Sequence, residues 1–123
     1  MRQEQVKHCT LFNCDCMELM AQYPDKHFDL AIVDPPYGLG EDGGDKQRRR
    51  KGENAVIHFA KKSWDKRIPD KTYFDEMKRV AKNRIIFGAN YMVEYLEPSM
   101  GWIVWDKGIG GDFSDCELVY TSF

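Results

Sequence analysis

Residues 28–38 decide the predicted fold, and they read Phe28-Asp29-Leu30-Ala31-Ile32-Val33-Asp34-Pro35-Pro36-Tyr37-Gly38. The apolar, β-branched run before Asp34 predicts a buried strand. The two prolines can continue neither a strand nor a helix, so we expect the strand to end at Asp34. A residue that precedes a proline is held extended, which applies to Asp34 and to Pro35. A carboxylate and a backbone carbonyl are thereby fixed at a strand's carboxyl end, the edge where open α/β sheets bind ligands.

This arrangement suits chemistry on the exocyclic amine of a nucleic acid base. Such an amine is a poor nucleophile because its lone pair is delocalised into the ring. Two acceptors, one for each amine hydrogen, would free the lone pair, and Asp34 and the Pro35 carbonyl are the candidates. Pro36 has no amide hydrogen, so no helical turn consumes that carbonyl. Tyr37 offers a ring on which a base can stack, worth about 1–3 kcal/mol. The alternative is a simple turn, because proline and aspartate are common turn residues.

Asp34-Pro35-Pro36-Tyr37 after an apolar strand resembles the catalytic motif of the amino-group DNA methyltransferases. These enzymes transfer a methyl group from S-adenosylmethionine to adenine N6 or cytosine N4. The chain is most similar to the phage and restriction-modification subgroup, in which the catalytic motif precedes the cofactor motif. The resemblance covers most of the chain and extends to Asn13-Cys14-Asp15-Cys16, Pro24-Asp25-Lys26, Arg84-Ile85-Ile86-Phe87-Gly88, Trp102-Ile103-Val104-Trp105-Asp106-Lys107 and Phe113-Ser114-Asp115.

The resemblance implies a site-specific DNA methyltransferase that flips its target base out of double-stranded DNA. Its catalytic residues would be Asp34, Pro35, Pro36 and Tyr37, and it would need no metal. Adenine N6 is favoured because the cytosine enzymes of the family more often begin the motif with serine. Cytosine N4 stays open as the alternative target. The resemblance leaves open whether the enzyme acts alone or beside a cognate restriction endonuclease, and in which oligomeric state.

Asp15 is a second candidate site residue. We expect a strand over residues 6–12 and a helix that starts at Asp15 and ends at Pro24. The residues alone leave two roles for Asp15, a helix cap or a ligand for an adenine amine or ribose. In the resembling enzymes the matching acidic residue lies near the adenosine of the cofactor. The resemblance therefore implies that Asp15, together with Asp34, binds S-adenosylmethionine.

Glycines and a basic cluster follow the catalytic motif. The glycines predict a mobile loop at about residues 38–54. The net charge of −2 gives no overall attraction to nucleic acid, so DNA contacts must come from local basic patches. Arg48, Arg49, Arg50 and Lys51 form the strongest such patch and are predicted to contact DNA phosphates. A solvated charge run is the alternative.

The remaining elements are predicted from apolar spacing and breakers. We expect a helix that Asp70 caps, whose core stripe includes Phe74 and Met77. Strands are expected over residues 55–60, 84–87, 102–105 and 116–123, with a short helix over 91–96. This alternation, like the resemblance, predicts a single domain over residues 1–123 with a Rossmann-like, doubly wound, mainly parallel α/β sheet, a partial S-adenosylmethionine-dependent methyltransferase fold. Core packing of Trp105 and solvation of Lys107 are favoured over DNA contact.

Two further expectations concern location and thiols. No apolar run is long enough to span a membrane and no signal peptide begins the chain, which predicts a cytoplasmic protein. The resemblance adds a prokaryotic, phage or mobile-element origin. Cys9, Cys14, Cys16 and Cys116 lack the paired two-residue spacers of usual zinc sites, so reduced thiols are favoured over zinc ligands.

One family feature is missing from the sequence. The family binds the methionine end of its cofactor with a glycine-rich turn after the catalytic motif, often Phe-x-Gly-x-Gly. Gly108-Ile109-Gly110-Gly111 occupies the place of a variable loop instead. We therefore expect a catalytic domain that is truncated at its C-terminus. The alternative is an inactive remnant that binds DNA or a partner without catalysis.

Overall fold

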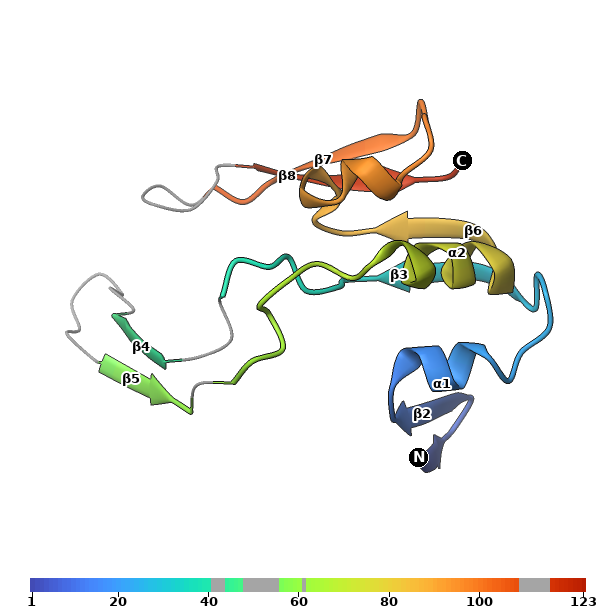
Figure 1. Ribbon diagram of the computed structural model, residues 1–123, viewed down its shortest axis with the longest axis horizontal. Coiled ribbons are helices and arrows are strands. Elements are labelled where there is room, and N and C mark those ends of the chain that lie inside the picture. Colours follow the sequence, from blue (N-terminus) through green and yellow to red (C-terminus); the bar gives the residue numbers. More distant parts are fainter. Residues whose placement is uncertain (41–43, 48–55, 61, 109–115) are drawn as a thin grey trace.

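A four-stranded mixed sheet forms the centre of the computed structural model, which describes residues 1–40, 44–47, 56–60, 62–108 and 116–123 (Figure 1). Its strands are β3 (Phe28–Val33), β6 (Ala81–Ile86), β7 (Trp102–Asp106) and β8 (Cys116–Thr121), in the order β3-β6-β8-β7. β3 and β6 are parallel, whereas β8 runs antiparallel to both of its neighbours. The predicted strand end at Asp34 is confirmed.

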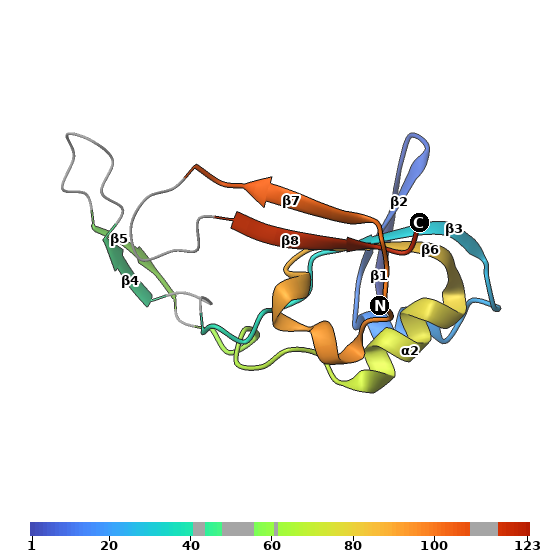
Figure 2. The ribbon, with the colours of Figure 1, turned by 90° about the horizontal axis from the view of Figure 1, so that it is seen from above.

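Helix α2 (Lys71–Val80) connects β3 to β6 and covers one face of the sheet (Figure 2). Asp70 caps the helix, and its Oδ1 accepts hydrogen bonds from the backbone amides of Thr72 and Tyr73 at 3.1 and 3.3 Å. The apolar stripe faces the sheet, since Phe74 and Met77 are buried. The predicted cap and the predicted stripe are both confirmed.

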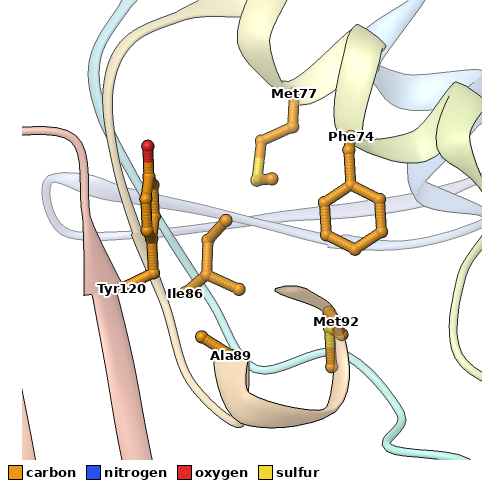
Figure 3. Close-up of a cluster of buried hydrophobic side chains, with 6 residues drawn as sticks. All are labelled: Phe74, Met77, Ile86, Ala89, Met92 and Tyr120. Carbon is orange, nitrogen blue, oxygen red and sulfur yellow. The ribbon is translucent and has the colours of Figure 1, made fainter. Parts of the chain in front are cut away.

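The core lies between α2, the sheet and the two 3-10 turns η1 (Ala89–Tyr91) and η2 (Val93–Tyr95) (Figure 3). Its buried side chains are Phe74, Met77, Ile86, Ala89, Met92 and Tyr120. The predicted helix over residues 91–96 is wrong. Met92 has φ −131° and ψ 17°, which is not helical, so this segment folds as two short turns.

The N-terminal residues form a separate hairpin. β1 (Arg2–Val6) pairs antiparallel with β2 (Cys9–Asn13), and Lys7 turns the chain with a φ of +54°. The predicted continuous strand over residues 6–12 is therefore wrong, because the chain reverses within it. α1 (Cys16–Met20) follows and is capped by Asp15. The predicted start of this helix at Asp15 is confirmed, whereas its predicted end at Pro24 is wrong because α1 ends at Met20.

Arg79 on α2 holds the α1 region in place. Its guanidinium donates to the backbone carbonyls of Met20 and Tyr23 at 3.0 and 2.9 Å. It also pairs with Glu76 at 2.8 Å and with Asp25 at 3.0 Å. These carboxylates raise the pKa of Arg79 above its ordinary value. Asp15 at the start of α1 is thereby fixed relative to α2.

A third sheet lies apart from the others in both views (Figures 1 and 2). It consists of β4 (Gly44–Gln47) paired antiparallel with β5 (Val56–Phe59). The strand predicted over residues 55–60 is confirmed as β5. The loop predicted at about residues 38–54 contains β4, so that prediction is wrong for residues 44–47.

The predicted doubly wound, mainly parallel sheet is wrong. In the described four-stranded sheet, only β3 and β6 are parallel. The described part of the chain has the α-helices α1 and α2, fewer than a doubly wound sheet needs to cover both of its faces. Residues 107–115 join β7 to β8, which is fewer than the dozen or more that a parallel crossover needs, so β8 returns antiparallel. The hairpin at Lys7 also removes the strand expected at the start of the chain. The predicted burial of the strand before Asp34 is wrong, because Leu30 and Ile32 are exposed. Ile103 on β7 is exposed as well, as in a sheet covered mainly on one face.

Among the described residues, no helix is long and apolar enough to cross a membrane.

Met77 provides a direct test of the core. Its side chain is 2% exposed, whereas that of Met100 is fully exposed. Met77→Ala should lower the free energy of unfolding by about 2–5 kcal/mol, because it removes buried methylene groups and leaves a cavity. Met100→Ala is the matched control and should change that free energy by less than about 0.5 kcal/mol. Urea denaturation followed by circular dichroism measures both, and equal losses in the two variants would contradict this core.

Candidate functional site

A cleft of about 950 Å³ opens at the carboxyl end of β3. Four chain segments line it: the start of α1, the catalytic motif, residues 63–70 and the first turn of α2. The described residues that line it are Asp15, Cys16, Met17, Asp34, Pro35, Pro36, Ser63, Trp64, Lys66, Arg67, Ile68, Pro69, Asp70, Thr72 and Tyr73. Asp15 and Asp34, far apart in the sequence, therefore share one cleft.

The end of β3 sets the position of Asp34 and Pro35. The amide of Phe87 donates to the carbonyl of Val33 at 2.9 Å, which continues the β3–β6 pairing to the last residue of the strand. Asp34 is exposed and its Oδ1 accepts a hydrogen bond from the Tyr37 hydroxyl at 2.6 Å. Pro35 is buried in the wall of the cleft. The carboxylate of the motif is thus accessible while its backbone is held.

Tyr37 is held by several contacts. Its hydroxyl lies 2.7 Å from Oε1 of Glu117 as well as 2.6 Å from Asp34. Burial, followed by the hydrogen bonds to these two carboxylates, raises the pKa of Tyr37 far above its ordinary value. The ring stacks on Tyr91 at a centroid distance of 5.3 Å. A Cβ atom on Gly88 would lie 2.1 Å from the Tyr37 ring, so only glycine fits beside it.

The position of Tyr37 differs from the role predicted for it. The described residues that line the cleft do not include Tyr37. One face of its ring is occupied by Tyr91. Stacking of an extruded base on Tyr37 stays untested, and in this conformation the ring is engaged with the protein.

Glu117 is a site residue that the sequence did not reveal. It lies on β8, is 2% exposed, accepts a hydrogen bond from the Gly88 amide at 3.1 Å and pairs with Lys107. Burial alone would raise the pKa of Glu117, but the hydrogen bonds from Lys107 and Tyr37 outweigh it and lower that pKa. A charged residue just before the apolar run of residues 118–120 was the available signal.

Lys107 was expected to be solvated, and that expectation is wrong. It pairs with Glu117, and its Nζ lies 5.1 Å from the ring centroid of Trp105. The ion pair and the cation–π contact together hold the ammonium group at the end of β7.

The number of hydrogens on the Tyr37 hydroxyl limits the hydrogen bonds that it can donate. A phenol carries one hydrogen, so Tyr37 can donate fully to only one carboxylate at a time. Donation to Glu117 leaves Oδ1 of Asp34 able to accept a hydrogen bond from another molecule. Glu117 therefore provides an alternative acceptor that can release Asp34.

Asp65 connects the cleft wall to the loop after the motif. It was not predicted from the sequence. It is 3% exposed, and its Oδ1 accepts a hydrogen bond from the Gly38 amide at 2.9 Å. Its backbone carbonyl accepts another from the Gly40 amide, also at 2.9 Å. Gly38 has φ +74°, which favours glycine. Residues 62–69 are thereby attached to the loop that follows Tyr37.

Asp15 lies in the cleft, whereas the predicted DNA-binding residues cannot be compared with the structure. Asp15 caps α1 through its Oδ1, which accepts a hydrogen bond from the Met17 amide at 2.8 Å, and it also lines the cleft. Its predicted contact with a cofactor stays a prediction. The predicted DNA-binding residues Arg48, Arg49, Arg50 and Lys51 lie outside the described residues.

Within the described parts of the chain, no group of three or more His, Cys, Asp or Glu side chains is placed to hold a metal ion. Cys9, Cys14, Cys16 and Cys116 are free thiols.

No protein-family model matches the chain, and a comparison with curated proteins finds no match.

The Glu117–Lys107 pair predicts a pH dependence of stability. Because the folded chain lowers the pKa of Glu117, the pair stabilises fully above the ordinary value of 4.5, and this stability is lost as the pH falls through the lowered value. Glu117→Gln should lower the free energy of unfolding at pH 7 by about 1–3 kcal/mol and should weaken the further loss on acidification. Urea denaturation at pH 7 and at about pH 3 measures both effects.

Glu97→Gln is the matched control for this experiment. Glu97 also pairs with a lysine, Lys78, but both side chains are about half exposed. Its replacement should cost less than about 1 kcal/mol at pH 7. An unchanged acid sensitivity in Glu117→Gln would contradict the role of the buried pair.

Proposed function

We propose that this chain transfers a methyl group from S-adenosylmethionine to the N6 amine of adenine in double-stranded DNA. The observation that carries this function is the cleft in which Asp15 and the Asp34-Pro35-Pro36 turn lie together at the carboxyl end of β3. The motif's resemblance to the amino-group DNA methyltransferases adds the reaction class. The sheet is not doubly wound, so this function rests on the site and not on the fold class.

The cleft suits a ligand of the size and charge of S-adenosylmethionine. Its volume of about 950 Å³ lies within the range of small-molecule pockets. Met17, Ile68 and Tyr73 provide apolar lining, and burial raises the pKa of Tyr73 to about 12, which keeps its hydroxyl neutral. Asp15 would hold the adenosine, and Asp34 would lie toward the positive sulfonium. When bound, the cofactor supplies an electrophilic methyl group.

The chain's own residues would prepare the amine. The target base leaves the duplex at a cost of a few kcal/mol. Asp34 and the Pro35 carbonyl would accept the two amine hydrogens, which would free the nitrogen lone pair to attack the methyl group that the cofactor supplies. Tyr37 donates to Glu117 during this step, which leaves Oδ1 of Asp34 for the amine.

Proton release follows methyl transfer. The nitrogen would take the methyl group from the sulfur of the cofactor, so the amine would have to lose one hydrogen as a proton. Asp34 can accept this proton, and because its carboxylate is exposed it can pass the proton to solvent.

The first experiment is mass spectrometry of nucleosides from mixed-sequence duplex DNA incubated with the chain and S-adenosylmethionine. We expect N6-methyladenine. N4-methylcytosine would keep the reaction class and change the target base. No methylated base, together with retained DNA binding, would contradict the proposed catalysis and favour a binding protein.

Asp34→Ala tests the assigned role of the motif carboxylate. It should lower methyl transfer at least about 100-fold, because the amine loses an acceptor and a route for its proton. Asp29→Ala is the matched control. Asp29 is an exposed carboxylate on β3, the strand that Asp34 follows, and it pairs with Lys82 at 2.6 Å. Its removal should leave the rate nearly unchanged. A near-normal rate in Asp34→Ala would exclude the assignment.

A further inference from the structure

Trp64 is the aromatic side chain that lines the cleft and remains largely accessible. It is 59% exposed and lies in the segment of residues 63–70, which lines the cleft together with the catalytic motif. The ring of Tyr37, in contrast, stacks on Tyr91. An exposed tryptophan in a cleft of this volume provides an apolar surface for a flat ligand.

The backbone around Trp64 is held against the motif. The adjacent Asp65 is buried and binds the amides of Gly38 and Gly40, both at 2.9 Å. Trp64 is therefore attached to the same loop that carries Tyr37. Because the backbone that carries Trp64 is held before a ligand binds, binding orders less of the chain and costs less entropy.

The cleft lining carries charges of both signs. Asp15, Asp34 and Asp70 supply carboxylates, and the exposed Lys66 and Arg67 supply positive charge next to Trp64 in the sequence. A nucleotide has matching chemistry, because its base carries a hydrogen-bonding amine and its phosphates are anionic.

We propose that Trp64 stacks on the extruded nucleic acid base, while Lys66 and Arg67 contact the neighbouring phosphates. This inference rests on the proposed function and assigns stacking to Trp64 in place of Tyr37. The base would lie with one face on the indole and its amine toward Asp34. Lys66 and Arg67 would supply backbone contacts that do not depend on base sequence.

Fluorescence of 2-aminopurine in a short single-stranded DNA oligonucleotide tests the stacking. The full chain should quench this probe on binding. Trp64→Ala should weaken binding by about 5- to 150-fold and remove most of the quenching, the range expected for one base–aromatic stack. Trp64→Phe should recover most of both effects. Trp102→Phe, which alters a tryptophan outside the cleft lining, should leave both unchanged.

Salt dependence tests the phosphate contacts. The double variant Lys66→Ala/Arg67→Ala should reduce the slope of log K against log salt concentration by about 1.4, which corresponds to two contacts on single-stranded DNA. An unchanged slope would overturn the phosphate assignment.

Methyl transfer measured in parallel separates this inference from the proposed function. Trp64-dependent quenching without methylation would support the stacking site and contradict catalysis. Methylation with unchanged binding and quenching in Trp64→Ala would overturn the role of Trp64 and leave catalysis standing. Circular dichroism checks that each variant is folded. Because Trp64 is exposed, its replacement should not unfold the chain.

Discussion

The hydroxyl of Tyr37 lies between two carboxylates, and the rest of the site depends on this contact. Asp34 stands at the end of β3, whereas Glu117 stands on β8, so the phenol links two strands that are not neighbours in the sheet. Because the phenol has one hydrogen, full donation to one carboxylate weakens its bond to the other. Lys107 and the Gly88 amide keep Glu117 ionised and in place. The exposed Asp34 is the partner that can exchange Tyr37 for another donor.

The β3–α2–β6 unit provides the rigid frame for this contact. The parallel pairing of β3 and β6 places the motif next to Gly88, and α2 buries the apolar residues beneath them. Arg79 and Asp65 then attach the other two walls of the cleft, one through α1 and one through residues 62–69. The cleft is therefore built from segments that are distant in sequence and that a few polar side chains hold together.

Local features of this fold could be predicted from the sequence, and long-range ones could not. Two prolines end β3 and Asp70 caps α2, because each effect acts within a few residues. The direction of β8 depends on the short connection from β7, and the hairpin at Lys7 depends on a positive φ that no glycine signals. Asp34 was predicted as a site residue from its place after a strand, and Asp15 from its place together with the family resemblance. Glu117 and Asp65 were not, since their partners lie 80 and 27 residues away.

The close approach of Gly88 to the Tyr37 ring has an evolutionary consequence. A side chain at position 88 would occupy the space of the ring, and Gly88 also has φ +64°, which disfavours other residues. A homologue that retains tyrosine at position 37 should retain glycine at position 88, whereas one with a small residue at position 37 loses the steric part of this constraint. The two positions should therefore covary, and their covariation in homologous sequences would record whether the tyrosine network has been kept.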